Sequence, residues 1–438
     1  MTAWPGESVT VDGFRTLPAR VLDLTDPARP SELLGATAGS AGDYQVSFSV
    51  PGGPAARHTL LVVAQDGISQ APGLVSNQPS HWHAAQPGAD MIILTHPAFV
   101  SQLAPLVRLR RAQGLKVAVV LTDDVYDEFN FGERSPQAVR DLLASALANW
   151  SVKPRYLLLV GDASIDPRDF LGLGNFDFVP TRLLATQELM TASDDWFSDF
   201  NDQGLPQIST GRLPVRTPQD AALLIGKIVA YDASPAPGPW KNQALLIADR
   251  DDTENFTSDS QAVQALLPSG LAATLLPTSA LDPATARQQV QAALAGGQLL
   301  VNYIGHGSVE VWSEQDLLDG ASASALANGP RLPVVFSVEC LNGFYQDVFT
   351  QSLAESLLLA PQGGAVAVVA SSGLLEPGPQ VQLDQKLVGT LFANPGTRIG
   401  DALRAAKAGV ADADTRRTYM LFGDPAQRVQ PPPAPDIR

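Results

Sequence analysis

Two residues in the second half of the chain, His306 and Cys340, have the side chains that nucleophilic catalysis requires. Cys340 is the only cysteine among 438 residues, and His306 stands between two glycines. A thiol with a reference pKa of about 8.5 is mostly protonated near neutral pH, so it needs a base or an electropositive pocket before it attacks a carbonyl carbon. An imidazole can take the thiol proton and later protonate the leaving amine. The pair therefore predicts acyl transfer through a thioester.

Both residues stand at the end of an apolar run that is typical of a buried strand. These runs are residues 298–306 (QLLVNYIGH) and 332–340 (LPVVFSVEC). Open α/β sheets bind ligands at the carboxyl ends of their strands, and flanking glycines let a substrate or another backbone come close. If the two strands share a sheet edge, both side chains face one cleft. The N–H groups of Gly307 and Cys340 are then the predicted donors to the oxyanion.

Ordinary structural roles are the alternative for histidine and cysteine. A lone histidine is often a hydrogen-bonded core or loop residue, and a lone cysteine is often a small buried hydrophobe. We interpret His81 and His83, in a loop rich in proline and serine, as solvated histidines rather than metal ligands. For His306 and Cys340, the shared position at strand ends favours catalysis.

The elements around these strands are expected to form a mostly parallel sheet flanked by helices. From Met91 onward, apolar runs alternate with helical patterns, which is typical of α/β proteins. The strands are predicted at residues 91–96, 116–122, 156–162, 243–249, 273–277, 298–306, 332–340 and 364–371. The helices are predicted near residues 98–113, 136–150, 217–232, 258–268, 282–296, 350–360, 378–393 and 398–411.

Changes in composition indicate the domain organisation. Residues 1–88 carry short β-like runs between Pro, Gly and Ser clusters, which predicts a small β domain or extension. The proline-rich stretch at 233–239 divides the rest into a first α/β subdomain, 89–235, and a catalytic subdomain, 236–430. The last residues, 431–438, contain four prolines and resemble a linker to further domains.

Charge and composition exclude several kinds of partner. A formal net charge of −16 argues against nucleic acid, because phosphate binding requires clustered Lys and Arg. We expect no membrane insertion, since no run of about 18 apolar residues is present. The first residues lack the basic and apolar regions of a signal peptide, and a single cysteine excludes an internal disulfide. The expected partner is a protein or peptide substrate.

The segments around the two candidate residues resemble the gingipain family of cysteine peptidases, which shares the caspase-like fold. Residues 301–308 (VNYIGHGS) are similar to the histidine motif of that family, and residues 340–344 (CLNGF) to its Cys-x-Asn-Gly nucleophile motif. Shorter similar segments at 158–162, 211–215, 364–371 and 421–425 extend the resemblance over roughly residues 90–428. The resemblance implies a caspase-like fold in two α/β subdomains, a Cys340/His306 dyad and export from the cell.

The resemblance also suggests roles for three acidic residues. Asp259 aligns with the residue that receives a basic P1 side chain in arginine-specific members. A place in the first turn of a helix, where an acid favours the helix dipole, explains Asp259 equally well. Asp251 aligns near an acidic residue that assists the histidine in the resembled family. Because the loop differs in length, Asp252 is the alternative for that role. Glu339 departs from the pattern, because a small residue is usual before the nucleophile; strand alternation directs Glu339 and Cys340 to opposite faces.

An acidic stretch at residues 193–204 offers oxygen ligands for Ca²⁺. Its candidate ligands are Asp194, Asp195 and Asp199. The spacing does not fit an EF-hand, and acidic turns without metal are common. The resembled family often binds structural calcium, which makes Ca²⁺ a candidate structural ion here. We expect no cofactor to be required for the reaction.

The sequence as a whole predicts a cysteine endopeptidase. One alternative is a sortase-like transpeptidase, in which an amine rather than water resolves the thioester. The other is a non-catalytic interaction module with the same fold. The resemblance implies an extracellular or cell-surface protein, while the missing signal peptide leaves the cytoplasm open.

Overall fold

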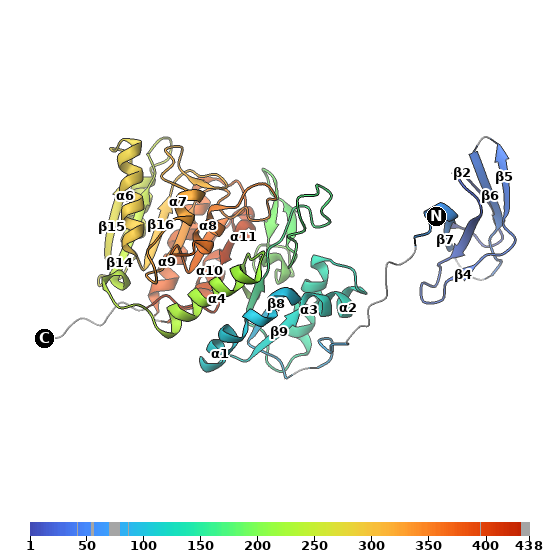
Figure 1. Cartoon of the computed structure of the whole chain (residues 1–438), viewed down its shortest axis with the longest axis horizontal. Helices are drawn as coiled ribbons and strands as arrows, with labels where there is room; N and C mark the ends of the chain where they lie inside the picture. The colour runs from blue at the N-terminus through green and yellow to red at the C-terminus, as the bar shows by residue number, and fades with distance from the viewer. Residues whose placement is uncertain (42, 54–56, 70–78, 86, 395, 431–438) are drawn as a thin grey trace. The chain divides into compact units, whose positions relative to one another are not determined.

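A computed structural model describes residues 1–430, except 42, 54–56, 70–78, 86 and 395 (Figure 1). The chain divides into two compact units, residues 1–78 and 79–438. The first lies within the predicted β region 1–88. The further division at residue 235 stays a prediction, and the predicted tail 431–438 lies outside the described residues.

The first unit is built from short antiparallel strands. The strands are β1 (Thr2–Ala3), β2 (Ser8–Phe14), β3 (Ala19–Asp23), β4 (Ser31–Glu32), β5 (Thr37–Ala41), β6 (Asp43–Ser49) and β7 (His58–Ala64). They form one sheet in the order β1-β7-β3-β4 and a second in the order β2-β6-β5. A small core includes Val21, Val46, Phe48 and Leu60. The predicted β character of this region is confirmed.

The second unit contains one sheet of ten strands. In chain order these are β8 (Met91–Thr95), β9 (Val117–Leu121), β10 (Tyr156–Val160), β13 (Ser209–Leu213), β14 (Gln243–Ala248), β15 (Ala272–Pro277), β16 (Leu300–Ile304), β19 (Val334–Val338), β20 (Ala367–Ser371) and β21 (Tyr419–Phe422). Their order across the sheet is β15-β14-β16-β19-β20-β21-β13-β10-β8-β9. All eight predicted strands are present, and β13 and β21 are additional.

The sheet consists of two parallel halves that run in opposite directions. Strands β15, β14, β16, β19 and β20 are parallel to one another, as are β21, β13, β10, β8 and β9. The halves join where β21 pairs antiparallel with β20. The carboxyl ends of β14, β16 and β19 therefore share one edge, and those of β10 and β13 lie at the other.

Helices cover both faces of this sheet (Figure 1). They are α1 (Ala104–Ala112), α2 (Thr122–Asn130), α3 (Pro136–Asn149), α4 (Pro218–Ala233), α5 (Phe256–Gln264), α6 (Pro283–Gly296), α7 (Gly320–Ser324), α8 (Leu353–Leu359), α9 (Pro377–Ala393), α10 (Ile399–Lys407) and α11 (Ala413–Thr418). The strands are apolar on both faces: in β8, Met91 and Ile93 join one core cluster, while Ile92 and Leu94 join another. The eight predicted helices are present, and α2, α7 and α11 are additional.

Two short hairpins complete the unit. The first pairs β11 (Arg182–Ala185) with β12 (Met190–Ser193), and the second pairs β17 (Val311–Trp312) with β18 (Leu318–Asp319). Thr191 of β12 donates a hydrogen bond to the carbonyl of Ser372, just beyond β20. The first hairpin therefore reaches the sheet edge where β16 and β19 end.

Candidate active site

The register of the sheet brings the two candidate catalytic residues to the same edge. Strands β16 and β19 are adjacent and parallel, with Ile304 paired to Val338. His306 and Cys340 each lie two residues beyond that pair. On the other side of β16, Ala248 of β14 pairs with Ile304, so the segment that follows β14 reaches this edge too.

His306 is held between an acidic loop and an aromatic ring. Its Nε2 atom lies 2.8 Å from Oδ2 of Asp252, in the loop after β14. Its ring is perpendicular to that of Phe256 of α5, with 5.2 Å between the ring centroids and 86° between the planes. The N–H of Glu254 and the contact with His306 lower the pKa of Asp252, which favours its charged form.

The neighbouring Asp251 has different partners. Its carboxylate accepts hydrogen bonds from the backbone and hydroxyl of Thr257, both at 2.9 Å, and from the hydroxyl of Ser279 at 3.1 Å. These contacts tie the loop to the start of α5. The structure thus brings Asp252 to His306, and it gives Asp251 the role of holding the loop.

The two glycines beside His306 are required by buried acidic side chains. A Cβ atom on Gly305 would lie 2.3 Å from Cβ of Asp249 and 2.5 Å from the hydroxyl of Tyr303. A Cβ atom on Gly307 would lie 2.1 Å from Oε2 of Glu339. All three distances are far below van der Waals contact. The glycines were expected to admit a substrate, whereas in the structure they make room for the protein's own carboxyl groups.

Cys340 is partly exposed, and its sulfur contacts the backbone of Leu375 and the side chain of Gln380. Sγ lies 3.4 Å from the nitrogen and 3.5 Å from the carbonyl oxygen of Leu375, and 3.8 Å from Nε2 of Gln380 at the start of α9. The next residue, Leu341, has φ 70°, in the left-handed region. The chain therefore turns sharply directly after the thiol.

The asparagine and glycine after Cys340 fix that turn. Asn342 is fully buried, and its amide donates to the carbonyl of Ser308, in the loop that carries His306. Its Oδ1 accepts from the hydroxyl of Ser337 at 2.9 Å. A Cβ on Gly343 would lie 3.0 Å from the carbonyl oxygen of Ser371. The Asn-Gly pair thus ties the nucleophile turn to the histidine loop.

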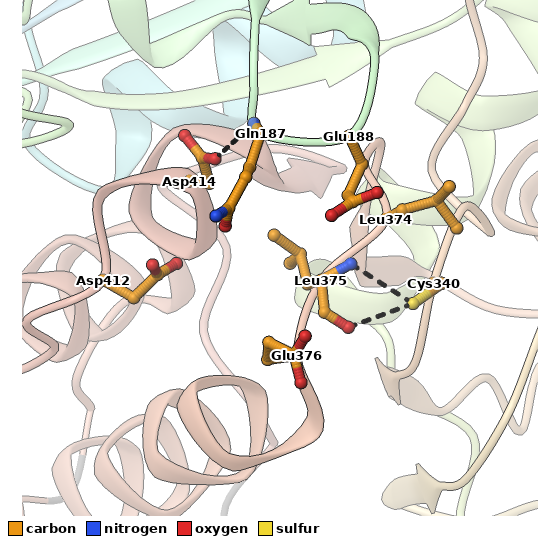
Figure 2. A pocket seen from close by; sticks show the side chains of 8 residues that line it. All are labelled: Gln187, Glu188, Cys340, Leu374, Leu375, Glu376, Asp412 and Asp414. Carbon is orange, nitrogen blue, oxygen red and sulfur yellow. Dashed lines mark hydrogen bonds between the residues drawn. The ribbon is translucent and has the colours of Figure 1, made fainter.

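A pocket of about 290 Å³ opens beside Cys340 (Figure 2). Three segments that are distant in sequence contribute to it: the turn between β11 and β12, the residues before α9, and the start of α11. Figure 2 shows carboxyl groups around it. The lining residues are Gln187, Glu188, Cys340, Leu374, Leu375, Glu376, Asp412 and Asp414. With four acids and no Lys or Arg among them, this pocket favours a cationic group.

Asp259 lies on α5 but does not line the pocket beside Cys340. It follows Phe256, the residue that contacts His306, by one helical turn. Its side chain is half-buried, and burial together with Glu254 and Asp251 raises its pKa. Its role in substrate binding stays a prediction.

The candidate calcium ligands bind protein groups instead. Asp194 accepts from Nε and Nη2 of Arg212 at 2.7 and 2.8 Å, and Asp195 forms an ion pair with Lys407. Asp199 accepts from two backbone N–H groups of its own loop. In the described part of the chain, no group of three or more His, Cys, Asp or Glu side chains is arranged to hold a metal ion. These three carboxylates do not fit a Ca²⁺ site.

The histidine pair in the proline-rich loop is exposed. His83 stacks on Phe129 with 4.3 Å between ring centroids, and its backbone N–H donates to Glu128 at 2.9 Å. His81 is exposed as well.

Relatives of this chain include proteins with and without an assigned activity. An uncharacterized protein from Archaeoglobus fulgidus is 24% identical over 369 residues, which is 72% of this chain and 86% of that protein. Gingipain R2 from Porphyromonas gingivalis is 23% identical over 291 residues, or 64% of this chain. The aligned region covers 36% of the length of Gingipain R2.

Solved structures show the same fold. The crystal structure of the Arg-specific cysteine proteinase gingipain R matches with a TM-score of 0.65 at 20% identity, over 81% of this chain and 80% of that one. The complex of the Porphyromonas gingivalis RgpB pro- and mature domains gives a TM-score of 0.66 at 20% identity, over 78% and 79%. The predicted gingipain-type α/β fold is confirmed.

The family itself is shown by a match to most of the chain. The family model of peptidase family C25 matches residues 84–430, which include both candidate catalytic segments. Because that match and the gingipain relatives agree, the chain belongs to peptidase family C25, a family of cysteine peptidases.

Proposed function

We propose that this protein is a cysteine endopeptidase in which Cys340 is the nucleophile and His306 the general base and acid. The observation that carries the proposal is the common position of the two residues, each two residues beyond the paired Ile304 and Val338 at one sheet edge. The contact of His306 with Asp252 supports it, because a carboxylate can orient an imidazole for proton transfer.

The proposed reaction follows from the groups at this edge. The thiolate of Cys340 attacks the peptide carbonyl carbon, and His306 protonates the leaving amine. Water then attacks the thioester, with His306 as its base, and releases the acid product. Within the described residues, the N–H groups of Gly307 and Cys340 have no acceptor, so both are available to the oxyanion.

The charge of the site suggests the substrate. Four carboxyl groups line the pocket beside Cys340, and Asp259 adds another on the side of His306. We infer a substrate with a basic residue next to the scissile bond, as the resemblance to arginine-specific members implies.

The resemblance also suggests the location of the protein. We infer that it acts outside the cell, as most members of the resembled family do. No helix in the described ranges is long and apolar enough to cross a membrane.

A fluorogenic peptide library tests the proposal with wild type, Cys340→Ala and His306→Ala proteins. We expect cleavage by the wild type only, confined to peptides with Arg or Lys at P1 and unaffected by a calcium chelator. Cleavage that persists in Cys340→Ala would contradict the assignment of the nucleophile. A folded wild type that neither cleaves nor reacts with iodoacetamide would favour the interaction module.

A second assay separates hydrolysis from transpeptidation. A labelled substrate is incubated with an added primary amine, and the products are separated by mass. Hydrolysis gives only the acid product, whereas an amide with the added amine would show that an amine resolves the thioester.

A further inference from the structure

Two buried acidic residues lie against the glycines that flank His306, and they differ in their partners. Asp249, against Gly305, accepts hydrogen bonds from the hydroxyls of Tyr303 at 3.1 Å and Ser313 at 2.6 Å, and from the N–H of His306 at 3.1 Å. The N–H of Arg250 is a further donor. Both carboxyl oxygens of Asp249 therefore have hydrogen-bond donors.

Glu339, against Gly307, has no such donors in the described part of the chain. Its side chain is 1% exposed, and neither carboxyl oxygen has a hydrogen-bond partner among the described residues. The hydroxyl of Ser337, which lies close to this carboxyl group, donates to Asn342 at 2.9 Å and accepts from Trp312 at 2.7 Å. A buried carboxylate without donors or a cation is strongly disfavoured, whereas a buried carboxylic acid is tolerated.

Among the described residues, no lysine, arginine or histidine is among the groups that act on the pKa of Glu339. Glu339 interacts electrostatically with Cys340, at the end of the same strand, with Tyr303 of β16 and with Tyr419 of β21. Asp249 acts on Tyr303, and Asp384 of α9 acts on Tyr419. Burial, followed by the negative charge of a Cys340 thiolate, raises the pKa of Glu339 well above its ordinary value. The hydroxyl of Ser337 and the backbone N–H of Asn342 lie close enough to oppose this shift in part, but neither meets the geometry of a hydrogen bond to the carboxyl group.

We propose that Glu339 is a positioning residue that works as a neutral carboxylic acid, packed against Gly307 and adding no charge beside the Cys340 thiolate. The part of this proposal that concerns catalysis rests on the proposed peptidase function. The protonated side chain occupies the space where a Cβ of Gly307 would lie, and the N–H of Gly307 is one of the two proposed oxyanion donors. Because the acid is neutral, the thiolate next to it in sequence forms without a repelling charge.

The neutral state is tested by alkylation of the thiol, which does not depend on peptidase activity. Rates of reaction with iodoacetamide are measured from pH 5 to pH 10 for the wild type and Glu339→Gln. We expect the same midpoint pH for both, because an amide replaces a neutral acid of the same shape. If Glu339 is ionised, removal of its charge shifts the midpoint down by roughly one pH unit or more, which would overturn the proposal.

A second neutral variant covers a failure of Glu339→Gln to fold. Glu339→Leu has a similar volume and no charge, and circular dichroism checks that each variant is folded. The same comparison of midpoints applies to it. An unchanged midpoint in the folded variant supports the neutral acid, and a lowered one excludes it.

The positioning role is tested by the conservative variant. We expect Glu339→Ala to lose about tenfold or more in kcat with a smaller change in KM, because the support of Gly307 is removed, and Glu339→Gln to restore most of that loss. Equal kcat in wild type and Glu339→Ala would exclude positioning. If no variant or wild type cleaves any peptide while alkylation proceeds normally, the proposed function fails, and the alkylation profiles still decide the charge of Glu339.

Discussion

The Nε2 atom of His306 lies 2.8 Å from Oδ2 of Asp252, so the other ring nitrogen, Nδ1, is free of this contact. Both side chains are about half exposed, at 50% and 45%, and an exposed contact of this kind adds little to stability. Its expected effect is on orientation: a carboxylate at one ring nitrogen fixes the proton there and leaves the other nitrogen to act as a base.

Replacement of Asp252 is therefore expected to impair catalysis more than folding. We predict that Asp252→Asn lowers kcat by about tenfold, with little change in KM, because His306 loses the group that orients it. Steady-state kinetics on the best peptide of the library measures this effect.

Asp251→Asn is the matched control, since it removes the same charge one residue earlier. It replaces one of the two accepting oxygens with an NH2 group, which weakens the bonds to Thr257 and Ser279, and is expected to lower the unfolding temperature while kcat stays within about threefold. A larger loss of kcat in Asp251→Asn than in Asp252→Asn would restore the role that the sequence suggested for Asp251.

The glycine before His306 is predicted to be intolerant of any side chain. In Gly305→Ala, the new methyl group would meet Cβ of Asp249 at 2.3 Å, and a backbone shift is needed to relieve that contact. We expect a loss of about 1–3 kcal/mol in the free energy of unfolding. Urea denaturation monitored by circular dichroism measures it.

Gly226→Ala tests whether the contact, rather than loss of glycine, causes this effect. Gly226 lies in the middle of α4, is exposed, and has no atom within 4 Å of a built Cβ. Alanine is expected to stabilise the protein there by about 0.5–1 kcal/mol, because it restricts the unfolded chain. Similar destabilisation by both substitutions would show that the loss of glycine, rather than the contact with Asp249, causes the effect.

The main strands were predictable from the sequence because each buried strand is a continuous apolar run. Strand β13 was not predicted, because it contains a charged residue, Arg212, although that residue is only 1% exposed. Its guanidinium is neutralised by Asp194 and bonded to the carbonyls of Gly161, Val179 and Pro180. No local pattern reveals that compensation, because the partners lie 18 to 51 residues away.

The candidate site was predictable only where its residues belong to strand ends. His306 and Cys340 were expected at one edge of the sheet, and the pairing of β16 with β19 places both residues at that edge. The choice between Asp251 and Asp252 depends on how a loop folds, which spacing does not determine. The acidic pocket was missed because Glu188, Glu376 and Asp412 come from three separate segments.

The proposed basic P1 preference can be assigned to one of two acidic groups. Asp259→Asn is predicted to reduce kcat/KM for Arg or Lys peptides by about tenfold or more if Asp259 receives the P1 side chain. Glu376→Gln, in the pocket beside Cys340, is the comparison. If kcat/KM for these peptides falls in Glu376→Gln and is unchanged in Asp259→Asn, the P1 side chain binds in the pocket beside Cys340. Asp259 is then only an acid in the first turn of its helix.

A buried acid on α9 is expected to set the pH dependence of stability. Asp384 is 3% exposed and accepts two bonds from Nδ2 of Asn302, at 2.9 and 2.8 Å. Burial raises its pKa to about 7, although the bonds from Asn302 oppose the shift. In the unfolded chain the group has an ordinary value of about 3.9.

Because the pKa of Asp384 is raised on folding, its effect is the reverse of that of an ion-paired carboxylate. Between about pH 4 and pH 7 the folded state keeps a proton that the unfolded state has lost, so stability falls as the pH rises through this range. Below this range the group adds no penalty. We predict that Asp384→Asn, a neutral isostere, unfolds several degrees higher than wild type at pH 8 and at the same temperature at pH 4.

Asp282→Asn provides a control of opposite sign. Asp282 accepts from the N–H of Thr285 at the start of α6, and hydrogen bonds from Thr285 lower its pKa. Because the pKa of Asp282 is lowered on folding, its charged carboxylate stabilises the folded state at pH values above its ordinary pKa, and this stabilisation is lost as the pH falls. Asp282→Asn is therefore not expected to raise the unfolding temperature at pH 8. Thermal unfolding at both pH values distinguishes the cases. If Asp384→Asn unfolds at the wild-type temperature at pH 8, the carboxyl of Asp384 is ionised without cost, and the buried contact with Asn302 must compensate its charge fully.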